Sequence, residues 1–171
     1  MPFVCTDHCN DCRRATGALL PFWLLCPTDM ISISLVQKSS ELEDGRLDTS
    51  RVPRGPWISA LDVFLAKGPV EDTYLSFFAS SPDRRRSFCQ RCGTMFAFCA
   101  FPTPDFIKFP MLDLLLGTID RYILEERFLS PERQLHWQTG IDWIREFSKD
   151  GLEGVPVYLT SNVATSMALT K

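Results

Sequence analysis

The chain has 171 residues, of which 45% are hydrophobic and 23% are charged, and its net charge is −3. This composition is typical of a globular protein, and the length predicts one domain with a sizeable buried core. The acidic balance argues against a nucleic-acid-binding surface over the whole domain. The sequence has no run of about 20 apolar residues, so no membrane-spanning segment is predicted.

The seven cysteines are the compositional feature that bears most on function. The first residues show neither the basic start nor the apolar run of a signal peptide, so we expect a cytoplasmic protein. In a reducing compartment, paired cysteines serve metal or redox chemistry more often than they form disulfides.

In chain order, residues 3–17 are expected to form a cysteine knuckle and a loop. Beyond them, short apolar or alternating runs bounded by Gly and Pro predict β-strands. These runs cover residues 19–26, 30–35, 73–79, 95–101 and 106–117.

Two long stretches lack a strand pattern. Residues 37–69 are rich in Ser, Glu, Asp, Arg, Gly and Pro and are predicted to form a long surface insertion. Residues 120–136 are polar and are predicted to be irregular. After them, one helix is expected, with Thr139 as its N-cap and Gly151 as its stop.

The predicted fold class is therefore mainly β, with one domain over residues 1–158 and a single short carboxy-terminal helix. Residues 159–171 are small and polar and are expected to form a flexible tail. The basic run Arg84–Arg86 follows a turn and is expected to form a solvated face.

Two C-x-x-C knuckles carry the strongest functional signal. Cys9 and Cys12 form the first, and Cys89 and Cys92 form the second. Two residues between the cysteines let both thiolates reach one tetrahedral ion, so the paired knuckles predict zinc binding. The alternative is a set of buried free cysteines that behave as small hydrophobic residues.

The residues around both knuckles resemble those of the glutathione-dependent formaldehyde-activating enzyme and centromere protein V family. Residues 8–18 match the H-C-x-x-C-R-x-x-[ST]-G part of its signature, and residues 88–94 match its F-C-x-x-C-G-[ST] knuckle. Residues 116–120 are similar to its G-[ST]-L-D strand end, and residues 131–143 to the carboxy-terminal pattern of its fungal members. The resemblance covers roughly residues 7–156.

This resemblance implies an Mss4-like zinc-binding β fold, with an open reactive zinc site at C-x-C-x-x-C and a closed structural site. The implied activity joins formaldehyde to glutathione as S-(hydroxymethyl)glutathione, which is carbon–sulfur lyase chemistry run in reverse. The expected partner is a small-molecule thiol such as glutathione. No nucleic-acid or membrane partner is expected, and the resemblance does not predict an oligomeric state.

The chain departs from the family pattern before the first knuckle. Only eight residues precede Cys9, so the upstream C-x-C pair is missing, either because the chain is shortened or because this member has lost one site. The first cysteine of C-x-C-x-x-C falls at Asp7, whose carboxylate is an accepted zinc ligand, and Cys5 is the other candidate. Two arrangements stay open. In one, Cys9 and Cys12 are catalytic in an open site with Asp7 or Cys5, and in the other the four knuckle cysteines share one closed site.

Four residues beside the first knuckle are further candidates. Arg13 and Arg14 are predicted to bind the carboxylates of a peptide-like thiol, because a guanidinium fork fits a carboxylate. The alternative for this pair is solvation or charge balance for zinc thiolates. Thr16 is a candidate substrate-binding residue, although it also suits a role in the turn at Gly17. His8 is a candidate ligand or proton carrier, but we favour an outward orientation, because adjacent residues do not easily face one metal.

Three functions follow as hypotheses. The leading one is a zinc-dependent carbon–sulfur lyase of the formaldehyde-activating type. The alternatives are a non-catalytic zinc module that binds a protein partner, and a tailoring or detoxifying enzyme of fungal small-molecule metabolism that uses the same zinc site. The insertion at residues 37–69 is where altered substrate specificity would lie, since fold analogy cannot choose a substrate.

Overall fold

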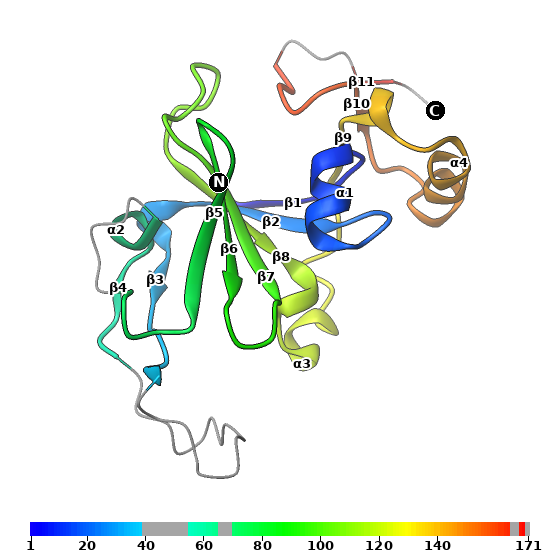
Figure 1. The fold of residues 1–171 in the computed structure, drawn as a ribbon. Helices are drawn as coiled ribbons and strands as arrows, with labels where there is room; N and C mark the ends of the chain where they lie inside the picture. The colour runs from blue at the N-terminus through cyan, green and yellow to red at the C-terminus, as the bar shows by residue number, and fades with distance from the viewer. Residues whose placement is uncertain (39–54, 65–69, 165–167, 170–171) are drawn as a thin grey trace. The chain divides into compact units, whose positions relative to one another are not determined.

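The computed structural model describes residues 1–38, 55–64, 70–164 and 168–169. Figure 1 shows the helices and strands of these residues, coloured by position along the chain. The chain divides into two compact units. The first unit consists of Met1–Cys26 and Asp113–Lys171, and the second consists of Pro27–Leu112.

The first unit is built on a mixed sheet. Its strands lie in the order β2, β1, β9, β10, β11. β1 pairs with β2 in the antiparallel sense and with β9 in the parallel sense, β9 and β10 are parallel, and β10 and β11 are antiparallel. The strands are β1 (Phe3–Asp7), β2 (Phe22–Pro27), β9 (Arg133–Leu135), β10 (Val157–Tyr158) and β11 (Ala168–Leu169). β8 (Met111–Leu115) crosses the boundary between the two units.

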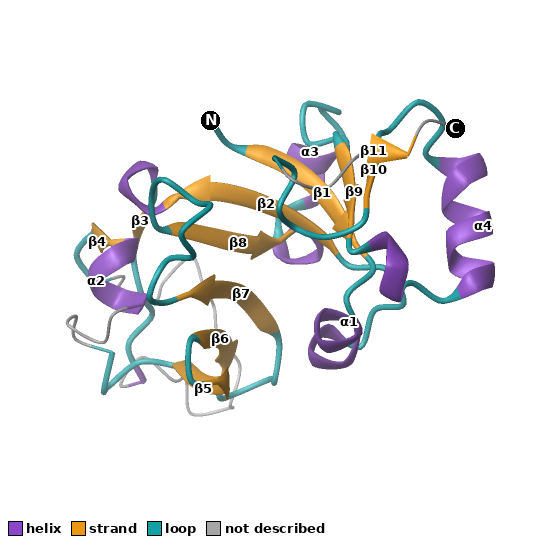
Figure 2. Ribbon diagram, turned by 90° about the horizontal axis from the view of Figure 1, so that it is seen from above, coloured by secondary structure: helices purple, strands orange, loops and turns teal. Residues whose placement is uncertain are grey.

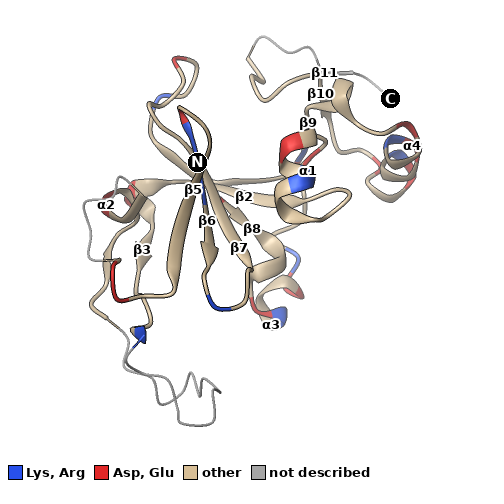
Figure 3. Cartoon of the chain, viewed as in Figure 1, with Lys and Arg blue, Asp and Glu red and all other residues tan. Residues whose placement is uncertain are grey.

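Three short α-helices belong to the described part of the first unit: α1 (Asn10–Thr16), α3 (Arg121–Leu124) and α4 (Asp142–Gly151). They are drawn in purple in Figure 2. α1 and α4 each carry both acidic and basic side chains (Figure 3). Among the described residues, none of the helices has the length and apolar character that crossing a bilayer requires.

The second unit contains an antiparallel meander and a separate two-stranded antiparallel sheet. β6 (Arg84–Cys89) lies between β5 (Leu75–Ser81) and β7 (Met95–Ala100). β3 (Ser32–Ile33) pairs with β4 (Ile58–Ser59), and α2 (Ala60–Phe64) follows β4 directly.

The core of the first unit forms around β1, which has a strand on each side. Val4, Cys5 and Thr6 are all buried, as expected for a central strand covered on both faces. Trp23 of β2, which is 2% exposed, lies opposite Cys5 in the strand register. This packing fixes the end of β1, where the candidate site begins.

The structure confirms the mainly β prediction and the expected carboxy-terminal helix, which is α4. The N-cap prediction is wrong: α4 begins at Asp142 after Ile141, because Thr139 already ends a short 3-10 helix, Trp137–Thr139. The single-helix expectation is also incomplete, since α1, α2 and α3 are present. The stretch 120–136, predicted to be irregular, contains α3 and β9.

The expectation of a knuckle and loop over residues 3–17 is wrong for most of that range, which forms β1 and α1. β1 is buried on both faces, so it lacks the apolar–polar alternation that marks a half-buried strand. The prediction of a solvated face at Arg84–Arg86 is wrong for Arg86. This residue lies in the middle of β6, is 2% exposed, and has its guanidinium 4.8 Å from the centre of the Phe98 ring.

The predicted insertion and tail lie partly outside the described residues. Of the range 37–69, residues 39–54 and 65–69 are not described. The rest includes β4 and α2, and α2 buries Ala60, Val63 and Phe64, so this part belongs to the core of the second unit. Of the tail, residues 165–167 and 170–171 are not described, while 168–169 form β11 against β10.

Candidate metal site

The candidate site forms where β1 gives way to α1. Asp7 is the last residue of β1, and its backbone N–H donates to the carbonyl of Pro21 at 3.1 Å. Cys9 is the N-cap residue of α1, and Cys12 lies within the helix, three residues on. That spacing places two side chains on the same side of a helical turn, so the C-x-x-C knuckle is built by the first turn of α1.

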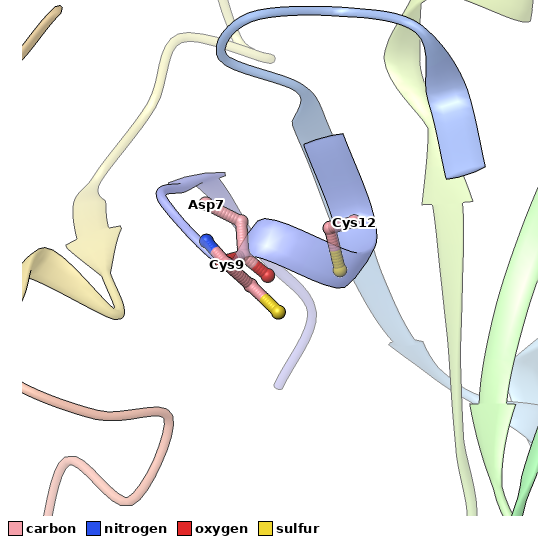
Figure 4. Close-up of side chains that lie close together, drawn as sticks. All are labelled: Asp7, Cys9 and Cys12. Atoms are coloured by element: carbon pink, nitrogen blue, oxygen red, sulfur yellow. The ribbon is translucent and has the colours of Figure 1, made fainter. Parts of the chain in front are cut away.

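The structure brings Asp7, Cys9 and Cys12 together (Figure 4). One carboxylate oxygen and the two sulfur atoms all lie within 4.8 Å of one another. Asp7 Oδ1 also accepts a hydrogen bond of 2.7 Å from the backbone N–H of Cys9, which fixes the carboxylate against the start of the helix. Cys12 is buried and Cys9 is partly exposed.

The surroundings of Cys9 favour its thiolate. A hydrogen bond from the Cys12 side chain is the largest cause that lowers the pKa of Cys9, and the backbone N–H groups of Cys12 and Asp11 act in the same direction. Burial and the charge of Asp7 act in the opposite direction. The net effect lowers the pKa of Cys9 to about 6. Cys9 is thus prepared to act as an anionic ligand at neutral pH.

The donor set suits a metal ion of the zinc type. Cysteine thiolates with one carboxylate are accepted zinc ligands, and their bonds of about 2.0–2.3 Å place tetrahedral ligands about 3.5 Å apart. The carboxylate oxygen and the two sulfur atoms, now within 4.8 Å of one another, would need to move only slightly closer together to reach that ligand–ligand distance. Three protein ligands leave a fourth position for water or substrate, which is the arrangement of a catalytic zinc site.

Between the two candidate third ligands, the geometry selects Asp7. Cys5 does not belong to the group of ligand atoms. It is 1% exposed in the centre of β1, and burial raises the pKa of its thiol well above its ordinary value. A buried, protonated thiol is a core residue rather than a ligand.

His8 lies between two members of the group but is held elsewhere. Its Nε2 lies 3.3 Å from Gln134 Oε1, its ring meets Trp137 edge-on at 4.9 Å, and its backbone N–H donates to Leu135. Its carbonyl accepts a 3.2 Å hydrogen bond from the Thr139 hydroxyl. Burial is the main cause that lowers the pKa of His8, so the ring is favoured in its neutral form. His8 therefore lies outside the ligand group, but its ring is 5% exposed and packs in the interior, so the outward orientation that we favour from the sequence is wrong. The same contacts hold the backbone between Asp7 and Cys9 in place.

The three candidate substrate-binding residues lie on α1. Arg13 is half-buried, and its Nε has no hydrogen-bond partner among the described residues. Arg14 is largely exposed and forms a 3.8 Å ion pair with Asp11. The Thr16 hydroxyl donates to the carbonyl of Cys12 at 2.9 Å and accepts from Ala18, so its donor is engaged at the helix end.

The turn that follows Thr16 needs a glycine. Gly17 is the C-cap of α1 with φ of 70°, and its N–H donates to the carbonyl of Arg13. Because residues with a side chain avoid this left-handed conformation, glycine is favoured here.

The second knuckle lies in the second unit, at the tip of the hairpin between β6 and β7. Cys89 ends β6 and is half-buried, whereas Cys92 is exposed. The Thr94 hydroxyl lies 3.2 Å from the Cys92 sulfur and is the largest cause that lowers the pKa of Cys92. Within the second unit, no third His, Cys, Asp or Glu ligand atom among the described residues forms a group with this pair.

Two residues that hold the site were not identified from the sequence. Gln134 is fully buried on β9 and pairs with Thr6 in the strand register, and Gly140 faces His8. The burial of Gln134 could not be predicted, because a strand of three residues is too short to show an alternation of buried and exposed positions. Gly140 is only a weak sequence signal that another side chain lies close to the backbone.

The thiolate of Cys9 leads to a first prediction. In the metal-free protein, we expect the rate of Cys9 alkylation by iodoacetamide to reach half its maximum near pH 6, because the thiolate is the nucleophile and the Cys9 pKa is about 6. Ionised Cys9 also contributes to the free energy of unfolding. This contribution is fully present above the ordinary thiol pKa of about 8.5 and is lost as the pH falls through about 6. Tandem mass spectrometry of the alkylated peptide locates the label. A midpoint near 8.5 would contradict the geometry.

A second prediction concerns the packing of Gly140. A Cβ atom there would lie 2.8 Å from His8 Nδ1 and 2.9 Å from Arg145 Cγ. Because His8 is anchored on several sides, we expect Gly140→Ala to lower the free energy of unfolding by about 1–3 kcal/mol through overpacking. Gly117→Ala is the matched control, since a Cβ at Gly117 meets nothing within 4 Å. Equal urea midpoints for the two variants would rule out the steric argument.

Asp7, Cys9 and Cys12 therefore form a three-donor group with one thiolate-prone cysteine, built by β1 and α1 and supported by the anchored His8. Within the described residues, this is the group whose geometry suits a metal ion. In comparisons with known proteins, no family model, no curated protein and no solved structure matches the chain.

Proposed function

We propose that the Asp7–Cys9–Cys12 group is an open zinc site and that the protein is a carbon–sulfur lyase of the formaldehyde-activating type. The observation that carries this proposal is the set of three donor atoms within 4.8 Å of one another. Three protein donors are the number that leaves a coordination position for a reactant. A fourth cysteine ligand would close the site and leave it structural.

The sequence motifs supply the reaction class. The knuckle and its flanks resemble those of the formaldehyde-activating enzyme and centromere protein V family, and Asp7 stands where that pattern has its first cysteine. The mainly β architecture is compatible with an Mss4-like fold, which we propose as part of the same reading. Fold class alone would not choose this chemistry.

The chain's own residues would take distinct roles. Asp7, Cys9 and Cys12 would hold the ion, whose Lewis acidity favours the thiolate form of a thiol substrate at neutral pH. Arg13, which is half-buried, would orient a substrate carboxylate through the exposed part of its guanidinium, and Arg14 would add a second positive charge. Thr16 would hold the helix end rather than the substrate.

The overall reaction balances without a further reactant. In the adduct-forming direction, the thiol sulfur bonds to the aldehyde carbon and the carbon–oxygen π bond opens. The proton lost by the thiol ends on the new hydroxyl group. Lyase cleavage is the reverse of these steps.

The adduct also forms without an enzyme, so the test must measure acceleration. We expect NMR exchange spectroscopy to show faster interconversion of glutathione, formaldehyde and their adduct with the wild-type protein than in buffer. Cys12→Ser should return the exchange rate to the buffer value, and Cys26→Ala, a buried substitution in β2, should keep the wild-type rate. Wild-type exchange equal to buffer would refute the enzymatic proposal.

An interaction module is the second candidate, because α4 exposes two large aromatic side chains. Trp143 is 56% exposed and Phe147 is 70% exposed, one helical turn apart. Exposed aromatic residues are enriched in binding surfaces. A partner that is retained after Cys12→Ser but lost after Trp143→Ala would favour this function over the lyase.

A further inference from the structure

The tip of the β6–β7 hairpin carries two thiols on one turn. The N–H of Gly93 donates to the carbonyl of Cys89 at 2.9 Å, and the N–H of Cys89 donates to the carbonyl of Thr94 at 2.9 Å. Gly93 has φ of 75°, a conformation that favours glycine. These bonds hold Cys89 and Cys92 on a closed turn. The turn is internal to the second unit.

The spacing and the surroundings of this pair suit disulfide formation. A tight turn keeps residues three apart within about 7 Å between Cα atoms, which overlaps the range that a disulfide spans. Cys92 is exposed, so a reagent can reach its sulfur, while Cys99 in the neighbouring strand β7 is 6% exposed. The pair therefore combines an accessible cysteine with a second thiol beside it.

Two basic side chains, Arg91 and Lys38, lie at this turn. Arg91 lies between the two cysteines and is exposed, with its guanidinium 5.9 Å from the Tyr74 ring centre. Lys38 Nζ lies 3.3 Å from the side-chain oxygen of Gln90, which also lies between the cysteines. Cationic groups at this position would attract an anionic disulfide.

We propose that Cys89 and Cys92 form a redox-responsive dithiol that closes to an intramolecular disulfide by exchange with a small anionic disulfide, such as oxidised glutathione. The Cys92 thiolate attacks one sulfur of the small disulfide, forming a mixed disulfide and releasing one thiolate. Cys89 then loses its proton and attacks the Cys92 sulfur, which closes the protein disulfide and releases the second thiolate. The two cysteines are oxidised, and the small disulfide is reduced to two thiols.

The sequence allows a direct test. Trypsin cleaves after Arg91, between the two cysteines, and separates peptide 87–91 from peptide 92–108. The full chain, kept in a chelator-containing buffer, is equilibrated with mixtures of reduced and oxidised glutathione, alkylated and digested. We expect the two peptides to be joined in most of the chains under oxidising mixtures and separated under reducing ones.

Matched variants identify the attacking sulfur. Cys89→Ser should trap glutathione on Cys92, and Cys92→Ser should lose both the peptide link and the trapped adduct at this turn. A link that persists in Cys92→Ser would place the disulfide at Cys99 and overturn the proposal, as would peptides that stay separate under every mixture. The Cys9→Ser, Cys12→Ser double variant should keep the response, so its result is independent of the proposed lyase function.

Discussion

Replacing Cys9 or Cys12 with serine is expected to abolish the zinc binding that we propose for the first unit. Both sulfurs lie within 4.8 Å of each other and of the Asp7 carboxylate, and Cys9 favours its thiolate form. Loss of one of three protein ligands removes a direct bond to the ion. We therefore expect zinc affinity to fall by more than the 10- to 100-fold that outer-shell changes cost. Elemental analysis and competition with a chromogenic chelator measure zinc content and affinity.

Three further variants separate the possible ligand sets. Asp7→Asn should weaken zinc binding while the fold persists, because the amide lacks the charge of the carboxylate. Cys5→Ala should retain wild-type affinity, because Cys5 lies in the core of β1 and outside the ligand group. Cys89→Ser should retain the zinc of the first unit. If Cys89→Ser instead left the protein without zinc, the four knuckle cysteines would share one closed site, and the lyase proposal would fail.

That Cys9 and Cys12 lie close enough to share a ligand group could be predicted from the sequence, because it depends on local spacing. Cys9 and Cys12 are three residues apart, and a metal-binding turn needs little more than that separation. The choice of Asp7 over Cys5 could not be made from spacing. It depends on Cys5 being central in a strand between β2 and β9, and the pairing with β9 joins residues that are more than a hundred positions apart in the chain.

The support around the site was beyond prediction for the same reason. His8 is oriented by Gln134, Trp137 and Thr139, all of which follow it by more than 120 residues. Arg86 shows the related limit for charged residues. A basic run beside a turn is usually solvated, yet the pairing of β6 with strands on both sides carries Arg86 into the interior.

The second large effect is expected at Trp23. This side chain is 2% exposed in β2, beside the central strand that ends at Asp7. Trp23→Ala removes the largest fully buried side chain and leaves a cavity, so we expect the free energy of unfolding to fall by about 3–5 kcal/mol. Urea denaturation followed by circular dichroism measures the change.

Trp143→Ala is the matched control, since it is the same substitution at a tryptophan that is 56% exposed on α4. Its free energy of unfolding should change by no more than about 0.5 kcal/mol. Trp23→Phe adds a second comparison. Trp23 Nε1 has no hydrogen-bond partner among the described residues, so phenylalanine removes an unsatisfied buried N–H and retains an aromatic ring. Trp23→Phe should therefore lower the free energy of unfolding clearly less than Trp23→Ala does. Equal losses for Trp23→Ala and Trp143→Ala would contradict the packing around β1 and the rigid support that it gives to Asp7.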